Sequence, residues 1–167
     1  PTRSSAASDV YKRQHDDIAE SFVPILVNAL NAQACEIRGC EKIVKYSESV
    51  LKADESDWST EYLLPIVSIK IVGNIDEALD HIDAYSSGHT ESIITEDLNN
   101  ASRFQKELDS AIVMHNTSTQ FADGGEFGLG GEIGIATGKF HARGPVGIDQ
   151  LTSFKYLVNG NGHIRPV

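Results

Sequence analysis

Polar side chains that can bind a small ligand follow directly after an apolar segment. Residues 111–115 read Ala-Ile-Val-Met-His, and Asn116, Thr117 and Ser118 come next. In a parallel α/β sheet, ligands bind beyond the carboxyl ends of the strands, so a strand at 111–115 would hold these side chains at a binding edge. Asn, Thr and Ser also make ordinary turns, which is the alternative interpretation.

Glycine is concentrated just beyond this row of polar residues. Nine of the fourteen glycines lie between Gly124 and Gly147. A loop so rich in glycine can approach a ligand closely and adopt positive φ, at an entropic cost that implies a use. A dinucleotide-binding fingerprint starting at Gly128 fails, because position 133 is Ile and no capped amphipathic helix follows. A flexible connector remains the alternative.

Cysteine and histidine do not form a recognisable site. Cys35 and Cys40 are the only cysteines, which agrees with a reducing compartment. Nothing near them in the sequence offers the base, cation or helix N-terminus that activates a thiol, so both are predicted to pack. The histidines lack ligand spacing and no metal site is predicted.

The length and charge exclude several classes of protein. The 167 residues fit one compact domain or a piece of something larger, and the formal net charge is −10. That charge repels polyanions, so nucleic-acid binding is not expected. No run approaches the roughly 18 apolar residues of a membrane-spanning helix and no secretory signal is recognisable. We therefore expect a soluble cytoplasmic protein without membrane contact.

The charge is unevenly spread along the chain. Residues 133–167 carry four basic side chains against one acidic one, whereas the rest is strongly acidic. We expect any anionic ligand near this C-terminal fifth, where His141 and Arg143 lie. Arg143 could pair in bidentate fashion with a phosphate or carboxylate, or could tie down a subunit interface.

The middle of the chain alternates strand and helix patterns. Residues 66–72, 92–95 and 111–115 are strand candidates. Asn74 and Asp97 can cap the helices between them. The helical stripes are Ile75, Ala78, Leu79 and Ile82, then Leu98, Ala101, Phe104 and Leu108. This order predicts an α/β fold in which the three strands form a parallel sheet with flanking helices.

The first third is less regular. One predicted helix carries an apolar face made of Ile18, Phe22, Ile25 and Ala29. Pro24 should kink this helix or delay its start. Residues 34–38 form a short strand-like run, and residues 41–62, which are acidic and irregular, are interpreted as a surface loop.

The C-terminal residues 152–158 are predicted to form an edge strand. Alternation places Ser153, Lys155 and Leu157 on one face and Thr152, Phe154, Tyr156 and Val158 on the other. An exposed edge beside an apolar face invites another chain, so a homo-oligomer through this strand is expected. In a lone chain the segment should project from the α/β core or fold back.

Three strings around the glycines carry a family resemblance. They are residues 115–124 (HNTSTQFADG), 126–134 (EFGLGGEIG) and 141–147 (HARGPVG). They closely resemble the gamma-glutamyl phosphate reductases, or glutamate-5-semialdehyde dehydrogenases, of the aldehyde dehydrogenase superfamily. The similarity covers essentially all of residues 15–167. Two departures are Thr117, where the family usually has Ala, and Gln120, where many members have Arg.

The resemblance implies a division of the chain into three parts. Residues 1–14 show no sustained period and look like a foreign or artefactual leader, which we leave out of the fold. Residues 15–147 correspond to a fragment of an aldehyde dehydrogenase catalytic domain. Residues 148–167 correspond to the C-terminal oligomerisation strand and tail.

The resemblance also implies a reaction. Family members reduce L-glutamyl 5-phosphate to L-glutamate 5-semialdehyde and phosphate with NADPH, in L-proline biosynthesis. A cysteine thiolate displaces phosphate, and the thioester then accepts hydride. That cysteine belongs to a Cys-Asn-Ala segment upstream of Ile18, at or before the leader, so we predict no catalytic residue here and an inactive fragment. A non-catalytic α/β binding module and another acylating aldehyde dehydrogenase are the alternatives.

Several residues of the chain match binding positions of the family. Glu61 matches the residue that hydrogen-bonds the nicotinamide ribose of NADPH/NADP, and the alternative is that it is one more carboxylate of an acidic loop. The expected substrate-binding residues are Asn116, Ser118, Thr119, Phe127, Gly128 and Arg143. The first three suit a glutamyl moiety, and Phe127 with Gly128 belongs to a loop that closes over the acyl chain in related enzymes. Glutamate 5-kinase is a further candidate partner.

Overall fold

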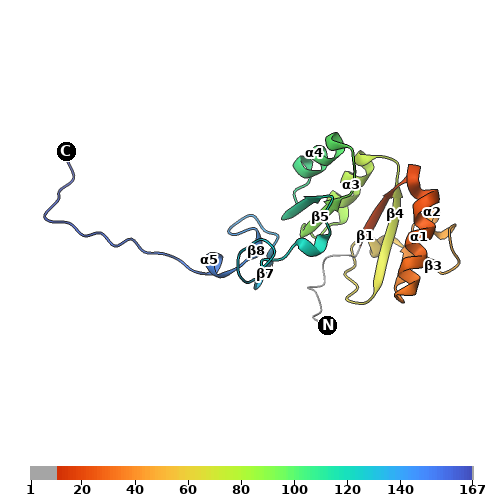
Figure 1. The fold of residues 1–167 in the computed structure, drawn as a ribbon, viewed down its shortest axis with the longest axis horizontal. Coiled ribbons are helices and arrows are strands. Elements are labelled where there is room, and N and C mark those ends of the chain that lie inside the picture. The colour runs from red at the N-terminus through yellow and green to blue at the C-terminus, as the bar shows by residue number, and fades with distance from the viewer. Residues whose placement is uncertain (1–10, 167) are drawn as a thin grey trace.

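The larger of the two parallel sheets has four strands in the order β1-β4-β2-β3 (Figure 1). The computed structural model describes residues 11–166. The strands are β1 (Tyr11–His15), β2 (Glu36–Gly39), β3 (Val50–Lys52) and β4 (Ile66–Val72). Every neighbouring pair is parallel. Helices α1 (Ala19–Ala32) and α2 (Glu41–Val44) complete this part of the molecule.

A second parallel pair, β5 (Thr90–Ile93) with β6 (Ile112–His115), follows in the chain. Helices α3 (Ile75–Tyr85) and α4 (Leu98–Glu107) pack with it over a small core. The residues buried in that core are Leu79, Ile82, Phe104 and Leu108. The predicted α/β fold with parallel strands and flanking helices is confirmed.

The prediction that three strands share one sheet is wrong in detail. β4 pairs with β1 and β2, while β5 pairs with β6. The physical reason is that β1 and β2 occupy both hydrogen-bonding edges of β4, so β4 has no edge left for β5. β2 overlaps the strand-like run 34–38 and extends to Gly39, whereas all but the last residue of β1 falls in the predicted leader 1–14.

The predicted leader is partly incorporated into the fold. Tyr11–His15 forms β1, so the last four leader residues are strand residues, and the first ten lie outside the described part of the chain. Arg13 on this strand is nearly buried, pairs with Glu91 at 3.6 Å and donates from Nε to His81 Nδ1 at 3.2 Å. Its Nη2 atom is buried and has no hydrogen-bond partner among residues 11–166. A foreign origin of residues 1–14 stays a prediction.

Helix α1 turns a different face to the core than predicted. Ala19, Val23 and Val27 are buried, whereas Ile18 and Phe22 are 51% and 41% exposed. The helix is apolar on more than one side, so periodicity alone cannot select the face that packs on the sheet. α1 begins at Ala19, after a 3₁₀ turn, and contains Pro24 in its interior, so Pro24 does not delay the start of the helix.

The segment 41–62 is more structured than the predicted surface loop. It contains α2, β3 and the 3₁₀ helix Glu55–Trp58, whose Asp57 and Trp58 are buried. Asp57 Oδ1 accepts hydrogen bonds from Arg38 Nη1 at 2.5 Å and from the Tyr62 hydroxyl at 2.7 Å. Burial raises the pKa of Asp57, but the Asp54 N–H, Tyr62 and Arg38 outweigh it and hold that pKa below its ordinary value.

The glycine-rich segment forms its own small unit. β7 (Gly134–Ala136) and β8 (Gly144–Val146) make an antiparallel hairpin, followed by the short helix α5 (Ile148–Leu151). Residues 152–158 then project from the body as extended chain without sheet pairing, as Figure 1 shows. Projection was one of the two outcomes expected for a lone chain.

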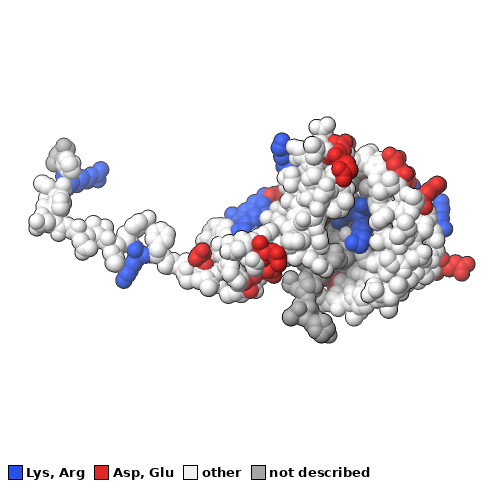
Figure 2. All heavy atoms as spheres, in the orientation of Figure 1, with Lys and Arg blue, Asp and Glu red and all other residues white. Residues whose placement is uncertain are grey.

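The charged side chains are distributed over the surface in small groups. On the face drawn in Figure 2, Lys and Arg do not merge into a continuous basic surface, and the projecting tail carries basic groups only. No helix in the described part of the chain is long and apolar enough to cross a membrane.

Candidate functional site

The carboxyl ends of β5 and β6 are joined by the side chain of Asn116. Its backbone has φ +53°, a left-handed conformation that Asn tolerates better than most residues. Its Oδ1 accepts the N–H of Thr95 at 2.9 Å, and its Nδ2 donates to the Thr95 carbonyl at 3.0 Å. The amide group therefore bridges the segments that leave the two strands.

Two further contacts fix this edge. The Ser92 hydroxyl donates to the carbonyl of Thr117 at 2.6 Å, and His115 Nε2 lies 2.9 Å from the Thr95 carbonyl. The side chains of Ser92, His115 and Asn116 are thus used to shape the loop. This supports the turn-making interpretation for Asn116. A ligand at this edge would therefore contact other residues of the loop.

Ser118 and Thr119 are presented by the turn that follows. Ser118 Oγ accepts the N–H of Gln120 at 3.3 Å and so caps the 3₁₀ helix Thr119–Phe121. Ser118 is exposed and Thr119 is half-buried. The Ser118 hydroxyl keeps its proton for a further acceptor while it caps. The structure thus brings Asn116, Ser118 and Thr119 together at one edge.

The loop that carries Phe127 and Gly128 is held by its own hydrogen bonds. Glu132 accepts the N–H of Gly124 at 2.8 Å, and Leu129 N donates to the Gly124 carbonyl at 2.8 Å. Gly128 has φ +74°, which a side chain would strain. Phe127 is 46% exposed. The loop is therefore ordered and presents an aromatic side chain to the surface.

Arg143 lies at the other end of β6 from Asn116. Its Nη1 donates to Asp109 Oδ1 at 2.7 Å and its Nη2 donates to the Asp109 carbonyl. Asp109 comes just before β6, whereas Asn116 comes just after it. Four strand residues span about 13 Å, so the structure does not bring Arg143 to the Asn116 edge. Its role in substrate binding stays a prediction, and a ligand anion there would compete with Asp109.

Glu61 lies at a cavity of about 400 Å³ beside the amino ends of β1 and β5. The cavity is lined by Tyr11, Ser59, Glu61, Ala84, Tyr85, Ser86 and Ser87. Within the described residues, the Glu61 carboxylate has neither a hydrogen bond nor an ion pair, and it is exposed. A free carboxylate can accept two hydroxyl groups, so Glu61 fits a ribose chemically, although it lies at the opposite end of β5 from the Thr95–Asn116 bridge.

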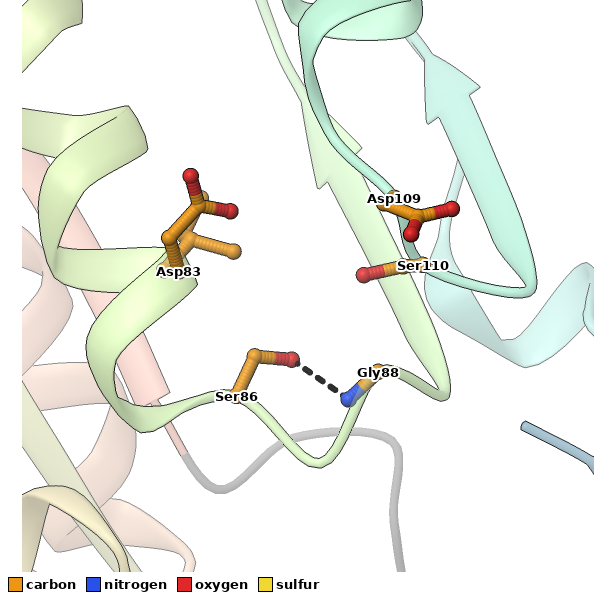
Figure 3. Close-up of a pocket in the computed structure, with 6 residues that line it drawn as sticks. Asp83, Ser86, Gly88, Asp109 and Ser110 are labelled. Carbon is orange, nitrogen blue, oxygen red and sulfur yellow. Dashed lines mark hydrogen bonds between the residues drawn. The ribbon is translucent and has the colours of Figure 1, made fainter. Parts of the chain in front are cut away.

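A smaller cavity of about 200 Å³ opens between the end of α3 and the starts of β5 and β6 (Figure 3). Asp83 and Asp109 line it on opposite sides, and Ser86 Oγ accepts the N–H of Gly88 at 2.9 Å. None of the residues predicted from the sequence to bind substrate or cofactor lines this cavity.

The cysteines pack against the core of the larger sheet. Cys35 and Cys40 are half-buried there, and Cys40 Sγ accepts the N–H of Ile71 at 3.4 Å. Burial raises the pKa of the Cys35 thiol, which keeps it protonated. Among the described residues no three metal-binding side chains gather at one place.

Two residues that hold the glycine-rich segment were missed from the sequence. Glu132 closes the loop, and Asp109 pairs with both Arg143 and Lys139. Asp109 lies 30 residues before Lys139, and no spacing rule connects an acidic residue ahead of a strand to a distant hairpin. The local excess of basic residues at 133–167 was the one available sign that these residues pair with an acidic group. It was interpreted as a binding site for an anionic ligand and not as a partner of Asp109.

Comparison with known proteins identifies the family of this chain. The chain belongs to the aldehyde dehydrogenase family, whose model matches residues 46–157. It is 52% identical over 152 residues to a gamma-glutamyl phosphate reductase of Desulforamulus reducens, covering 91% of the chain and 37% of that protein. It is 60% identical to that of Parvibaculum lavamentivorans, over 89% of the chain and 35% of the relative.

A solved structure agrees with this assignment. The crystal structure of gamma-glutamyl phosphate reductase from Thermotoga maritima matches with a TM-score of 0.85 and 50% identity, over 94% of the chain and 38% of that protein. The resemblance predicted from the motif strings is confirmed. The chain spans a little over a third of the length of the relatives it matches.

Proposed function

We propose that the full-length protein containing this segment is an NADPH-dependent reductase that converts L-glutamyl 5-phosphate to L-glutamate 5-semialdehyde and phosphate in L-proline biosynthesis. The observation that carries the proposal is 52–60% identity to gamma-glutamyl phosphate reductases over about nine-tenths of the chain. In this proposal the chain supplies a C-terminal part of the catalytic domain, and the protein works in the cytoplasm.

The proposed substrate surface is the edge at the carboxyl ends of β5 and β6. Asn116 holds the loop through Thr95, and Ser118 and Thr119 offer hydroxyl groups to the glutamyl amino and carboxylate groups. Phe127 and Gly128 cover the acyl chain from the ordered glycine loop. Arg143 is the proposed anion-binding residue, and it lies at the other end of β6 from this edge.

For the cofactor, Glu61 is the residue of this chain that fits. Its exposed carboxylate has no hydrogen bond or ion pair among the described residues and can accept the hydroxyls of the nicotinamide ribose. NADPH supplies the hydride when bound. What Glu61 does is to orient the ribose, and the preference for NADPH over NADH is part of the proposal.

Neither cysteine of the chain is proposed as the nucleophile. Cys35 has a raised pKa and both thiols pack against the core, so they lack the activation that acyl transfer requires. The nucleophile is proposed to lie outside this chain, in the same polypeptide. The proposed partners are a second copy through residues 152–158 and glutamate 5-kinase as the source of the acyl phosphate.

The reverse reaction tests the proposal. The full-length protein should reduce NADP in the presence of glutamate 5-semialdehyde and inorganic phosphate, and the 167-residue chain should not. Coenzyme A replacing phosphate as the acyl acceptor would indicate another acylating aldehyde dehydrogenase. No turnover by a folded full-length protein contradicts the proposal, and turnover by the 167-residue chain contradicts the placement of the nucleophile.

A further inference from the structure

Asp109 gathers two cations of the glycine-rich hairpin at the start of β6. Its two carboxylate oxygens pair with Arg143 and Lys139, and its carbonyl accepts a second bond from Arg143. Lys139 and Arg143 both belong to the turn between β7 and β8. We propose that Asp109 is a positioning residue that clamps this hairpin, and the glycine loop joined to it, onto the α/β body.

The hairpin and the glycine loop are one unit, so a clamp on the hairpin positions both. Ile133 N donates to the Val146 carbonyl at 2.9 Å, which ties the loop end to β8. Gly147 packs so closely on the loop that an added Cβ would lie 2.8 Å from the Gly131 carbonyl oxygen. Movement at Asp109 is thereby transmitted to the segment that carries Phe127.

The geometry makes this pairing more than a chance surface contact. A single exposed ion pair contributes little, because water screens it and two side chains lose freedom. Here one residue meets two cations, and the Arg143 guanidinium binds the side chain and the backbone of the same residue. The Arg143 side chain is only 28% exposed and its Nε is buried, so its ion pair with Asp109 is less screened by water than a fully exposed pair.

The chain offers a matched control across the cavity of Figure 3. Asp83 faces the same 200 Å³ cavity and is exposed, and within the described residues it has no ion pair or hydrogen bond. Asp83→Asn removes the same charge from the same region without touching the clamp. Asp109→Glu keeps the carboxylate on a side chain longer by one methylene.

Trypsin gives a direct readout, because it cleaves after Arg143 and must first pull that side chain away from Asp109. Cleavage after Lys155 on the exposed tail serves as the internal reference in each molecule. The 167-residue chain is digested briefly, and the initial rates at both bonds are taken from peptide masses. In Asp109→Asn, the ratio of the cleavage rate after Arg143 to the cleavage rate after Lys155 should rise about threefold to tenfold, and Asp83→Asn should leave this ratio unchanged.

Two further arms separate a clamp from a loss of fold. Asp109→Glu should restore most of the protection of Arg143. Raising the salt from 0.05 to 0.5 M should raise the wild-type ratio and leave that of Asp109→Asn unchanged. An unchanged ratio in Asp109→Asn with native circular dichroism overturns the proposal. If that variant unfolds, a wild-type ratio that is independent of salt overturns it. No arm depends on enzymatic activity, so these outcomes are independent of the proposed function.

Discussion

At the scale of single residues, the cluster around His81 makes the stability depend on pH. His81 is almost fully buried, packs edge-on against Trp58 and accepts a hydrogen bond from Arg13. Burial lowers its pKa to about 4, with Arg13 and Lys70 adding to the shift. Glu91 also faces Arg13, and burial raises its pKa. The folded state therefore resists protonation of His81.

The sign of the pH effect follows from the lowered pKa. The unfolded chain binds the proton near the ordinary value of 6.5, so the stability is complete above pH 6.5 and falls as the pH drops toward 4. When the pH is lowered from 7.5 to 5, the lowered pKa of His81 should reduce the free energy of unfolding by about 1–2 kcal/mol, after allowance for solvent screening. Urea unfolding at both pH values measures this loss. His81→Gln should flatten the slope and His163→Gln, on the exposed tail, should not; equal slopes in all three proteins would contradict the assignment to His81.

The sequence predicted single residues well where the effect is local. Asn74 and Asp97 were predicted to cap helices, and both accept backbone N–H groups at the starts of α3 and α4. Asp57 was assigned to a surface loop, yet it is buried with Arg38 and Tyr62. A cap depends on neighbours three positions away, whereas a buried carboxylate depends on partners that only the folded chain brings near.

At the scale of elements, substitutions in α1 test which face of the helix packs against the sheet. Val23 is fully buried against the sheet and Phe22, the next residue along the helix, is 41% exposed. Val23→Ala should lower the free energy of unfolding by about 1.5–3 kcal/mol and Phe22→Ala by less than about 1 kcal/mol, despite the larger side chain removed. Chemical denaturation of the 167-residue chain measures both. A larger loss for Phe22→Ala would show that the face predicted from the sequence is the packed one.

A helix or strand was predictable wherever its hydrophobic pattern fitted only one structure. Residues 66–72 were read as a strand and β4 has the same bounds, because a β-branched run buried on both sides fits little else. α1 carries apolar residues on more than one side, so its orientation was decided by the sheet and not by its own sequence. The same holds for pairing: β4 uses both edges for β1 and β2, which no local pattern records.

At the scale of the whole molecule, the proposed site divides between two strand edges. Asn116 and Ser118 were predicted from their place after a strand and Thr119 from the family resemblance, and the structure gathers all three at the carboxyl ends of β5 and β6. Glu61 was matched by resemblance and Arg143 was singled out in the basic C-terminal region, and each lies at an amino end. The strand-end rule located Asn116 and Ser118 because it depends on topology alone. The distance of the other two from that edge depends on long-range packing.

The projecting C-terminal segment carries the last prediction, which concerns assembly. Phe154 and Tyr156 have ring centroids 5.2 Å apart and are 79% and 83% exposed, so the alternation places both rings on one side of the extended chain. Such a segment leaves backbone groups and an apolar face uncovered, and a second copy is the proposed cover.

In the full-length protein, replacing both Phe154 and Tyr156 by Asp should shift the proposed dimer toward the monomer, because two charges would enter the proposed strand–strand contact. Sedimentation velocity across a concentration series measures the shift. Ser153→Asp, on the opposite face, is the control and should leave the oligomer in place. An unchanged oligomer in the double variant would remove the C-terminal segment from the interface and direct the search to the exposed apolar residues at and before α1, which are Ile18, Phe22 and Ile25.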